Sequence, residues 1–301
     1  MRCPDTAFTV RVPSVTGPEG VRLTRRDVLV LTTKTQQAEA AVAQWADVPV
    51  HDTDGQVVGR ASDQLPILTA LNGVAGEEIA LRYFDRVFGV CVWFPTVMVE
   101  PGEVLVRGAA LRGIFHIGRY GISPDPRGDT AMMDALRRDW MAADFEVVQP
   151  GDVMRWKYRK LIANVGNVLQ ALLGDTTDAT DLRRAADAEA REVLVAAGIS
   201  IPDDQEASAA WAGYAVRPVP GEPAVMGGST WQSLIRGTGT IETTYLNGEI
   251  ALIARRMGRS APINAGLTAA ARRAAREGLE PGAIDPDQLR TQLNLETTAK
   301  E

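Results

Sequence analysis

A lysine and two asparagines recur at helical spacing in the segment WKYRKLIANVGN, residues 156–167. Lys160, Asn164 and Asn167 stand at positions i, i+4 and i+7, so on one α-helix they fall within about 60° of one another. Asparagine is a poor residue for the middle of a helix because its amide competes for backbone hydrogen bonds. An ammonium group beside two amides can protonate and orient a polar substrate. The alternative is that Lys160 extends to solvent while the amides tie neighbouring helices together.

A second polar segment, GGSTWQSLIRGTGTIETTYLNGE, covers residues 227–249. Ser229 or Thr230 can cap a helix, and Thr240 can cap the next helix with Glu242 in its first turn. The helix dipole favours a carboxylate at that position. Taken alone, capping explains Ser229 and Glu242 without any chemistry.

Two further polar residues each follow an apolar segment. Lys34 comes after the run LVLTT, and Asn72 comes after LPILTAL. If these runs are parallel strands, both residues lie at the carboxyl ends of the strands, where open α/β sheets bind ligands. Each residue is also common in an ordinary turn.

The elements that position these residues change character along the chain. Residues 8–15 alternate apolar with polar and predict a half-buried strand. Residues 27–33 are almost entirely apolar or β-branched and predict a strand covered on both faces. A helix over 35–46, a second buried strand followed by the Asn72–Gly73 loop, and a helix from about residue 76 continue the alternation. Further strands are expected over 87–108, around a turn at Glu100–Gly102, and at GIFHIG; the whole pattern predicts a parallel sheet covered by helices.

From residue 130 onward the apolar residues recur with the period of a helix. The helices we predict cover about 130–143, 152–173, 179–197, 203–215, 229–237, 241–258 and 263–277. The segment SPDPRGD, residues 123–129, is the expected linker. The fold class is therefore α/β followed by all-α, with an α/β domain over 1–125, a helical domain over 130–280 and a weakly ordered tail over 281–301.

Composition narrows the function classes. A net charge of −6 and a pI near 5.2 provide no basic field for nucleic acid or anionic lipid. Two cysteines, Cys3 and Cys91, make no disulfide framework, and two histidines, His51 and His116, make no histidine-rich metal site. No apolar run approaches the roughly 18 residues of a membrane span. These features predict a cytoplasmic protein with no nucleic-acid, membrane or metal partner.

Five segments together resemble a known family. DVLVLTTKTQQ, LNGVAGEE, FHIG, WKYRKLIANVGN and IETTYLNGEIALIARRMGRSAPIN, in this order and at these separations, resemble the ketopantoate reductases (2-dehydropantoate 2-reductases) over residues 20–275. The most specific parts are the Lys-x3-Asn helix, the Glu…Tyr-Leu-Asn-Gly helix and the Pro-x-Asn turn at residues 262–264. The resemblance implies a Rossmann-type NAD(P)-binding domain plus a helical domain. It also implies NADPH and a small-molecule 2-keto acid bound in the cleft between them, and a place in pantothenate biosynthesis.

The resemblance also implies roles in the helical half. Lys160 matches the catalytic lysine, Glu242 its acidic partner, and Asn164 the substrate-binding asparagine one turn later. Hydride addition to a ketone leaves negative charge on oxygen, so a proton donor is needed there. A lysine supplies that proton, and a nearby carboxylate keeps it charged until then.

Other matches concern the cofactor and the substrate carboxylate. Lys34 matches the lysine that closes the cofactor site, and Asn72 matches the asparagine beside the nicotinamide ribose. Ser229 matches the serine that holds the substrate carboxylate, and Thr230 takes this role if the gap is placed differently.

Three departures bear on the substrate. The family's second helix asparagine falls eight residues after the lysine, where this chain has Val168, so Asn167 is expected to serve a shifted substrate. Thr244 replaces an acidic residue, and the spacing from Ser229 to Glu242 is one residue longer than usual. The substrate therefore stays open among 2-keto acids and ketones.

The family begins with a strand, a Gly-x-Gly-x-x-Gly loop and a helix, and these are not visible near the start of this chain. Roughly 40–50 residues would supply them. The sequence is therefore expected to be N-terminally truncated. Either the true start lies upstream, which we favour, or this is a truncated copy whose cofactor binding is impaired. Two alternative functions stay open: a non-catalytic remnant and an opine- or imine-type dehydrogenase on the same fold. The sequence also leaves open whether the protein forms a homodimer.

Overall fold

The computed structural model describes residues 1–174, 176–222, 227–237 and 239–295. The chain divides into two compact units, which we call the sheet unit and the helical unit. The sheet unit comprises Met1–Lys157 and Pro202–Ala224, and the helical unit comprises Tyr158–Ile201 and Val225–Glu301. Each unit is described separately below.

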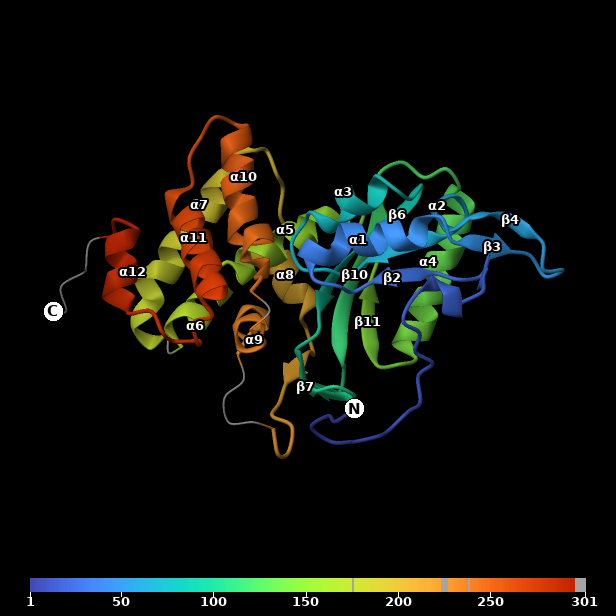
Figure 1. The fold of residues 1–301 in the computed structure, drawn as a ribbon, viewed down its shortest axis with the longest axis horizontal. Coiled ribbons are helices and arrows are strands. Elements are labelled where there is room, and N and C mark those ends of the chain that lie inside the picture. Colours follow the sequence, from blue (N-terminus) through green and yellow to red (C-terminus); the bar gives the residue numbers. More distant parts are fainter. Residues whose placement is uncertain (175, 223–226, 238, 296–301) are drawn as a thin grey trace. The chain divides into compact units, whose positions relative to one another are not determined.

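The sheet unit contains most of the strands (Figure 1). Its strands are β1 (Leu23–Thr24), β2 (Leu29–Leu31), β3 (Pro49–His51), β4 (Val57–Arg60), β5 (Pro66–Thr69), β6 (Arg86–Trp93), β7 (Thr96–Glu100), β8 (Glu103–Val106), β9 (Gly108–Ala109), β10 (Gly113–Tyr120), β11 (Phe145–Val148) and β12 (Ala215–Val216). Its helices are η1 (Pro18–Gly20), α1 (Thr35–Ala46), α2 (Ala61–Gln64), α3 (Gly76–Leu81), α4 (Pro126–Met141), the first part of α5 (Val153–Asn164), and α8 (Asp204–Ala210).

The central sheet has the strand order β11-β10-β6-β5-β2. Strands β2, β5 and β6 run parallel, as the alternation of strands and helices predicts. Strand β10 instead runs antiparallel to β6. The reason is the connection: the β7–β8 hairpin joins β6 to β10, whereas a parallel pair needs a longer crossover, usually a helix. The expected parallel sheet is therefore a mixed one.

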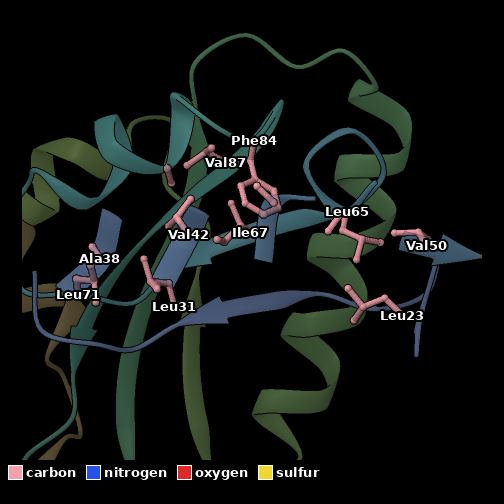
Figure 2. Close-up of a cluster of buried hydrophobic side chains, with 13 residues drawn as sticks. Leu23, Leu31, Ala38, Val42, Val50, Leu65, Ile67, Leu71, Phe84 and Val87 are labelled. Carbon is pink, nitrogen blue, oxygen red and sulfur yellow. The ribbon is translucent and has the colours of Figure 1, made fainter. Parts of the chain in front are cut away.

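Apolar side chains cover both faces of this sheet. On one face, Leu31, Ile67 and Val87 from the strands pack with Val42 of α1 and with Phe84 (Figure 2). On the other face, residues such as Phe88, Val90 and Ile117 pack with Met133 of α4. Burial of each large apolar side chain contributes about 1.5–3 kcal/mol, so these two layers hold the sheet between its helices.

Strand β2 lies at one end of the strand order. Its Val30 is 44% exposed, so the expected cover on both faces is absent at this residue. Beside β2 is a mostly apolar pocket of about 250 Å³. The pocket is lined by Leu29, Val30, Leu31, Thr32, Thr33, Ala41, Val42, Trp45 and Ile67.

The half-buried strand predicted over residues 8–15 is wrong. No strand forms there, and Val10 and Val12 are 66% and 74% exposed. The nearest pairing is an isolated bridge from Arg2 to Ala7. Alternation marks a strand only where a partner strand is available, and Pro13 removes one of the backbone donors that such pairing needs.

The predicted domain boundary near residues 125–130 also differs from the structure. Helix α4 already begins at Pro126, capped by the Asp125 side chain, and it leads to β11. Strand β11 pairs in parallel with β10, so it extends the central sheet. The sheet unit therefore continues to Lys157, because a helix with one buried face can serve a sheet as well as a bundle.

The helical unit begins at Tyr158, in the second half of α5 (Figure 1). Its elements are α6 (Asn167–Leu173), η2 (Thr177–Ala179), α7 (Thr180–Ala196), α9 (Ser229–Ile235), η3 (Glu242–Tyr245), α10 (Asn247–Arg256), α11 (Pro262–Glu277) and α12 (Pro286–Gln292). Within the described ranges, no helix has both the length and the apolar composition to cross a membrane.

The tail predicted to be weakly ordered contains α12. Asp285 caps this helix through the backbone N–H groups of Asp287 and Gln288, and Leu289 is buried. Arg290 forms an ion pair with Asp181 of α7 at 2.7 Å. One buried leucine and one ion pair thus hold in place a segment whose sequence shows little apolar periodicity. Residues 296–301 of the predicted tail lie outside the described residues.

Candidate active site

The polar stripe lies on two helices instead of one. Helix α5 ends at Asn164 and α6 begins at Asn167, so the helix predicted over 152–173 is broken at Val165–Gly166. Across this break the Asn167 amide donates a hydrogen bond to Asn164 Oδ1 at 3.2 Å. Lys160 lies one turn before Asn164 and is half-buried. The structure thus joins the two asparagines directly and keeps the lysine on the preceding turn.

A buried amide network fixes the helix break. Asn247 Nδ2 donates to the carbonyl oxygen of Val165 at 3.0 Å and to Asn264 Oδ1 at 2.9 Å. Asn264 Nδ2 in turn donates to Glu189 Oε1 at 2.8 Å, and Glu189 also accepts the backbone N–H groups at the start of α11. Asn247 and Asn264 are at most 1% exposed. Because buried donors and acceptors are costly to leave unpaired, this network holds α5, α10 and α11 in register.

The Asn-Gly of the Tyr-Leu-Asn-Gly motif and the Pro-x-Asn turn are therefore positioning elements. The side chains of Asn247 and Asn264 donate to backbone carbonyl oxygens, and Asn247 also donates to Asn264, all within the helical unit. Sequence reasoning recognised both motifs but gave them no role, because a buried asparagine and a substrate-binding asparagine look alike in a sequence.

The start of α9 lies beside Asn167. Gly228 precedes this helix, and its backbone N–H donates to Gln170 Oε1 of α6 at 2.9 Å. A Cβ placed on Gly228 would stand 3.8–3.9 Å from atoms of the Asn167 side chain. Gly228 occupies the N-cap position of α9, so neither Ser229 nor Thr230 is the N-cap residue that the sequence suggested.

Thr230 is 1% exposed and its hydroxyl has no hydrogen-bond partner. A buried unpaired hydroxyl costs free energy, and this one lies in the first turn of α9, the helix whose start is beside Asn167. Ser229 is the first residue of α9, and its side chain lies outside what the structure describes.

Glu242 is the first residue of η3 and is 3% exposed. Its place in a first turn agrees with the sequence interpretation, although the predicted helix over 241–258 is divided into η3 and α10. A buried carboxylate needs a cation or several donors to stay ionised. The pairing of Glu242 with Lys160 stays a prediction.

In the sheet unit, Lys34 and Asn72 lie at the carboxyl ends of neighbouring parallel strands. Lys34 is the N-cap residue of α1 just after β2, and Asn72 follows β5. The hydroxyl of Thr35 donates to the backbone oxygen of Asn72 at 3.3 Å, so the two loops adjoin. This is the sheet edge where α/β proteins hold ligands.

A buried ion pair in the sheet unit escaped sequence reasoning. Lys157 Nζ donates to Glu77 Oε1, and the two side chains are 2% and 0% exposed. Thr69 Oγ1 donates to the same carboxylate oxygen at 2.6 Å. Gly89 and Gly118 leave room here for Val153 of α5, which sits 2.9–3.0 Å from where their Cβ atoms would stand. The pair thus holds the first turns of α5 on the sheet.

Beside this pair lies a buried histidine. His116 of β10 is fully buried, and its ring stacks on Trp156 of α5 with centroids 3.9 Å apart. Neither ring nitrogen has a hydrogen-bond partner, and burial lowers the pKa of His116 to about 4. His116 is therefore neutral at physiological pH and acts as a packing residue.

The sheet unit has a partly parallel sheet with polar loops at the carboxyl ends of its strands. The helical unit holds a lysine, a buried carboxylate and two paired asparagines. These features are those of a Rossmann-like oxidoreductase. Profiles of one family match both halves: Ketopantoate reductase PanE/ApbA over residues 2–121, and Ketopantoate reductase PanE/ApbA C terminal over residues 152–275. The chain belongs to the ketopantoate reductase family.

Individual relatives agree with this assignment. A 2-dehydropantoate 2-reductase of Pyrococcus horikoshii is 27% identical over 157 residues, which are 50% of this chain and 45% of that protein. The matched part therefore spans less than half the length of this curated relative.

Solved structures show the same fold. A PanE/ApbA family ketopantoate reductase from Ralstonia eutropha JMP134 is similar with a TM-score of 0.67 and 22% identity, over 92% of this chain and 85% of that one. D-mandelate dehydrogenase with NADH and anilino(oxo)acetate is similar with a TM-score of 0.64 and 17% identity, over 87% and 80% of the two chains.

Proposed function

We propose that this protein reduces the ketone of a 2-keto acid to the 2-hydroxy acid, with NADPH as the hydride donor and ketopantoate or a related acid as substrate. The observation that carries the proposal is the Asn164–Asn167 hydrogen bond, which joins two amides that follow Lys160 in the chain. The same helical unit holds a buried carboxylate, Glu242. Family membership supports the reaction class.

Lys160 is the proton donor in this proposal. As the carbonyl carbon accepts hydride, the carbonyl oxygen gains negative charge, and the ammonium group delivers a proton to that oxygen. Glu242 keeps the lysine charged before transfer, because an opposite charge nearby favours the protonated ammonium. A neutral amide at Asn164 orients the substrate without cancelling the charge on Lys160.

Asn167, Ser229 and Thr230 bind the substrate in this proposal. The Gly228–Gln170 hydrogen bond, which holds the start of α9 beside Asn167, supports it. The unpaired Thr230 hydroxyl supports a carboxylate contact, because a carboxylate oxygen would satisfy its donor.

Lys34 and Asn72 would contact the cofactor, which supplies the hydride when bound. Their loops fit this role because they adjoin at the carboxyl edge of β2 and β5. In addition, α1 has no acidic residue in its first turn to repel a phosphate. The D-mandelate dehydrogenase complexes contain NADH, which supports the class of cofactor. The choice of NADPH comes from family resemblance and is tested by comparing the two cofactors.

The test is the oxidation of NADPH or NADH by the full chain with a panel of 2-keto acids, with and without added amines. Lys160→Ala is expected to lower kcat by about 10²–10⁴-fold, the usual contribution of a positioned acid. Glu242→Gln should shift the pH profile and lower kcat less. Arg255→Ala, an exposed change on α10, is the matched control. Undiminished turnover in folded Lys160→Ala would refute the assignment, and turnover only with amines would indicate an imine-forming dehydrogenase.

A further inference from the structure

The helical unit contains a polar pocket of about 300 Å³. Its walls come from the start of α6 on one side and from η2 and the start of α7 on the other. The lining residues are Gly166, Asn167, Leu169, Gln170, Thr176, Ala179, Thr180 and Arg183. Hydroxyl and amide groups line most of it, and Arg183 is the one charged residue among these lining residues.

Arg183 lies flat against the helix break. Its Cγ, Cδ and Nε atoms stand 3.3–3.5 Å from where a Cβ on Gly166 would be, so the missing side chain at Gly166 makes room for the arginine. Arg183 is also exposed, which leaves its guanidinium group accessible to an incoming anion. A guanidinium group binds a carboxylate through two parallel N–H donors.

Three of the carboxylates on α7 have partners other than Arg183. Asp187 pairs with Arg191 at 2.7 Å, Asp181 pairs with Arg290 at 2.7 Å, and Glu189 accepts the backbone N–H groups of Ile263 and Asn264. Among the lining residues, Arg183 therefore carries the one charge beside neutral side chains, and a guanidinium group favours an anionic ligand.

The pocket shares residues with the candidate active site. Asn167 lines it and also donates to Asn164 Oδ1, and Gln170 lines it while accepting from Gly228 before α9. Lys160 stands seven residues before Asn167, on the helix that precedes the break at Val165–Gly166. A substrate whose reacting carbonyl meets Lys160 can therefore reach this pocket only through a chain of several carbons.

We propose that this pocket receives a second, distal carboxylate of the substrate and that Arg183 recognises it. The preferred substrates are then 2-oxo dicarboxylic acids with a chain of intermediate length. This inference rests on the proposed function, since it names the substrate class for the same site.

The experiment compares two acids of matched length on the full chain: 2-oxopimelate, which ends in a carboxylate, and 2-oxoheptanoate, which ends in a methyl group. In Arg183→Gln the KM for 2-oxopimelate should rise about 10- to 100-fold, the effect of losing a hydrogen bond to a charged group. The KM for 2-oxoheptanoate should stay unchanged. Arg184→Gln, the neighbouring exposed arginine of α7 that does not line the pocket, is the matched control.

Binding gives a second readout that needs no turnover. Calorimetry with pimelate, which has no ketone, should show binding to the unmodified chain and about tenfold weaker binding to Arg183→Gln. Loss of pimelate binding in this variant supports the pocket even if no keto acid is reduced, in which case the proposed reaction alone fails. Reduction of 2-oxoheptanoate with no preference for 2-oxopimelate, unchanged in Arg183→Gln, overturns the pocket assignment and leaves the reaction standing.

Discussion

The side-chain amide of Asn247 donates to the carbonyl oxygen of Val165, 3.0 Å away, at the point where α5 ends. Without this bond the carbonyl would be a buried acceptor at a helix terminus, where the backbone has no partner of its own. The same amide donates to Asn264 at 2.9 Å. The distance between the turn that carries Lys160 and the helix that carries Asn167 is thus set by an asparagine more than 80 residues away in the chain.

Replacing this asparagine should damage both stability and activity. Asn247→Leu keeps the volume but leaves the Val165 carbonyl and Asn264 Oδ1 without their donor, which should cost about 2–4 kcal/mol of unfolding free energy. Urea denaturation measures the loss, and kcat should fall because Asn164 and Asn167 separate. The exposed Thr244→Ala in η3 is the control. A variant as stable as the parent would show that the network does not hold the helix break.

The buried pair in the sheet unit predicts a strongly asymmetric response. Lys157→Met should destabilise the protein by about 3–5 kcal/mol, because Glu77 is left as an uncompensated buried charge. The double change Lys157→Met with Glu77→Gln should recover much of that loss. Arg82→Ala breaks the exposed Arg82–Glu78 pair and should cost less than about 1 kcal/mol in the same denaturation experiment.

His116 predicts a loss of stability in acid. Burial lowers the pKa of His116 from 6.5 to about 4, so below pH 6.5 the unfolded chain binds a proton that the folded chain resists. The stabilisation is fully present above pH 6.5 and is lost as the pH falls toward 4, by up to about 3 kcal/mol. His116→Phe should remove this slope from unfolding curves taken between those pH values. His51→Gln, a change at the chain's other histidine, should keep it.

Thr230 offers a test that separates binding from structure. Thr230→Val removes a buried hydroxyl that has no partner, so the unfolding free energy should rise by about 1 kcal/mol. If that hydroxyl holds the substrate carboxylate, KM should rise about tenfold in the same variant. Thr243→Val removes another unpaired buried hydroxyl and should stabilise without changing KM. Equal KM values in both variants would exclude Thr230 from the substrate contacts.

Much of the fold could be predicted from the sequence because its signals are local. The helix over 35–46 and the strand that ends before Asn72 follow from periodicity and turn residues, and the structure confirms both. The direction of β10 could not be predicted this way, because it depends on which strands the β7–β8 hairpin brings together. The place of β11 in the sheet is likewise set by a partner, β10, that no local pattern identifies.

In the candidate site, too, local patterns could be read from the sequence, whereas contacts between distant segments could not. Lys160, Asn164 and Asn167 stand out as polar residues at helical spacing, yet the break at Val165–Gly166 depends on the distant Asn247. Glu77 and Lys157 could not be recognised as a pair, because their separation of 80 residues is closed only by the packing of α5 on the sheet. A charged residue on the inner face of a short helix such as α3 is the signal that would have pointed to Glu77.

The outer margin of β2 has a practical consequence for handling the protein. Among the described residues, no strand pairs with the outer edge of β2. Val30 is accessible there, and the mostly apolar pocket adjoins the strand. Such a margin favours strand addition between molecules. Scattering from concentrated samples should therefore grow with protein concentration, and Val30→Lys should suppress that growth while leaving turnover intact.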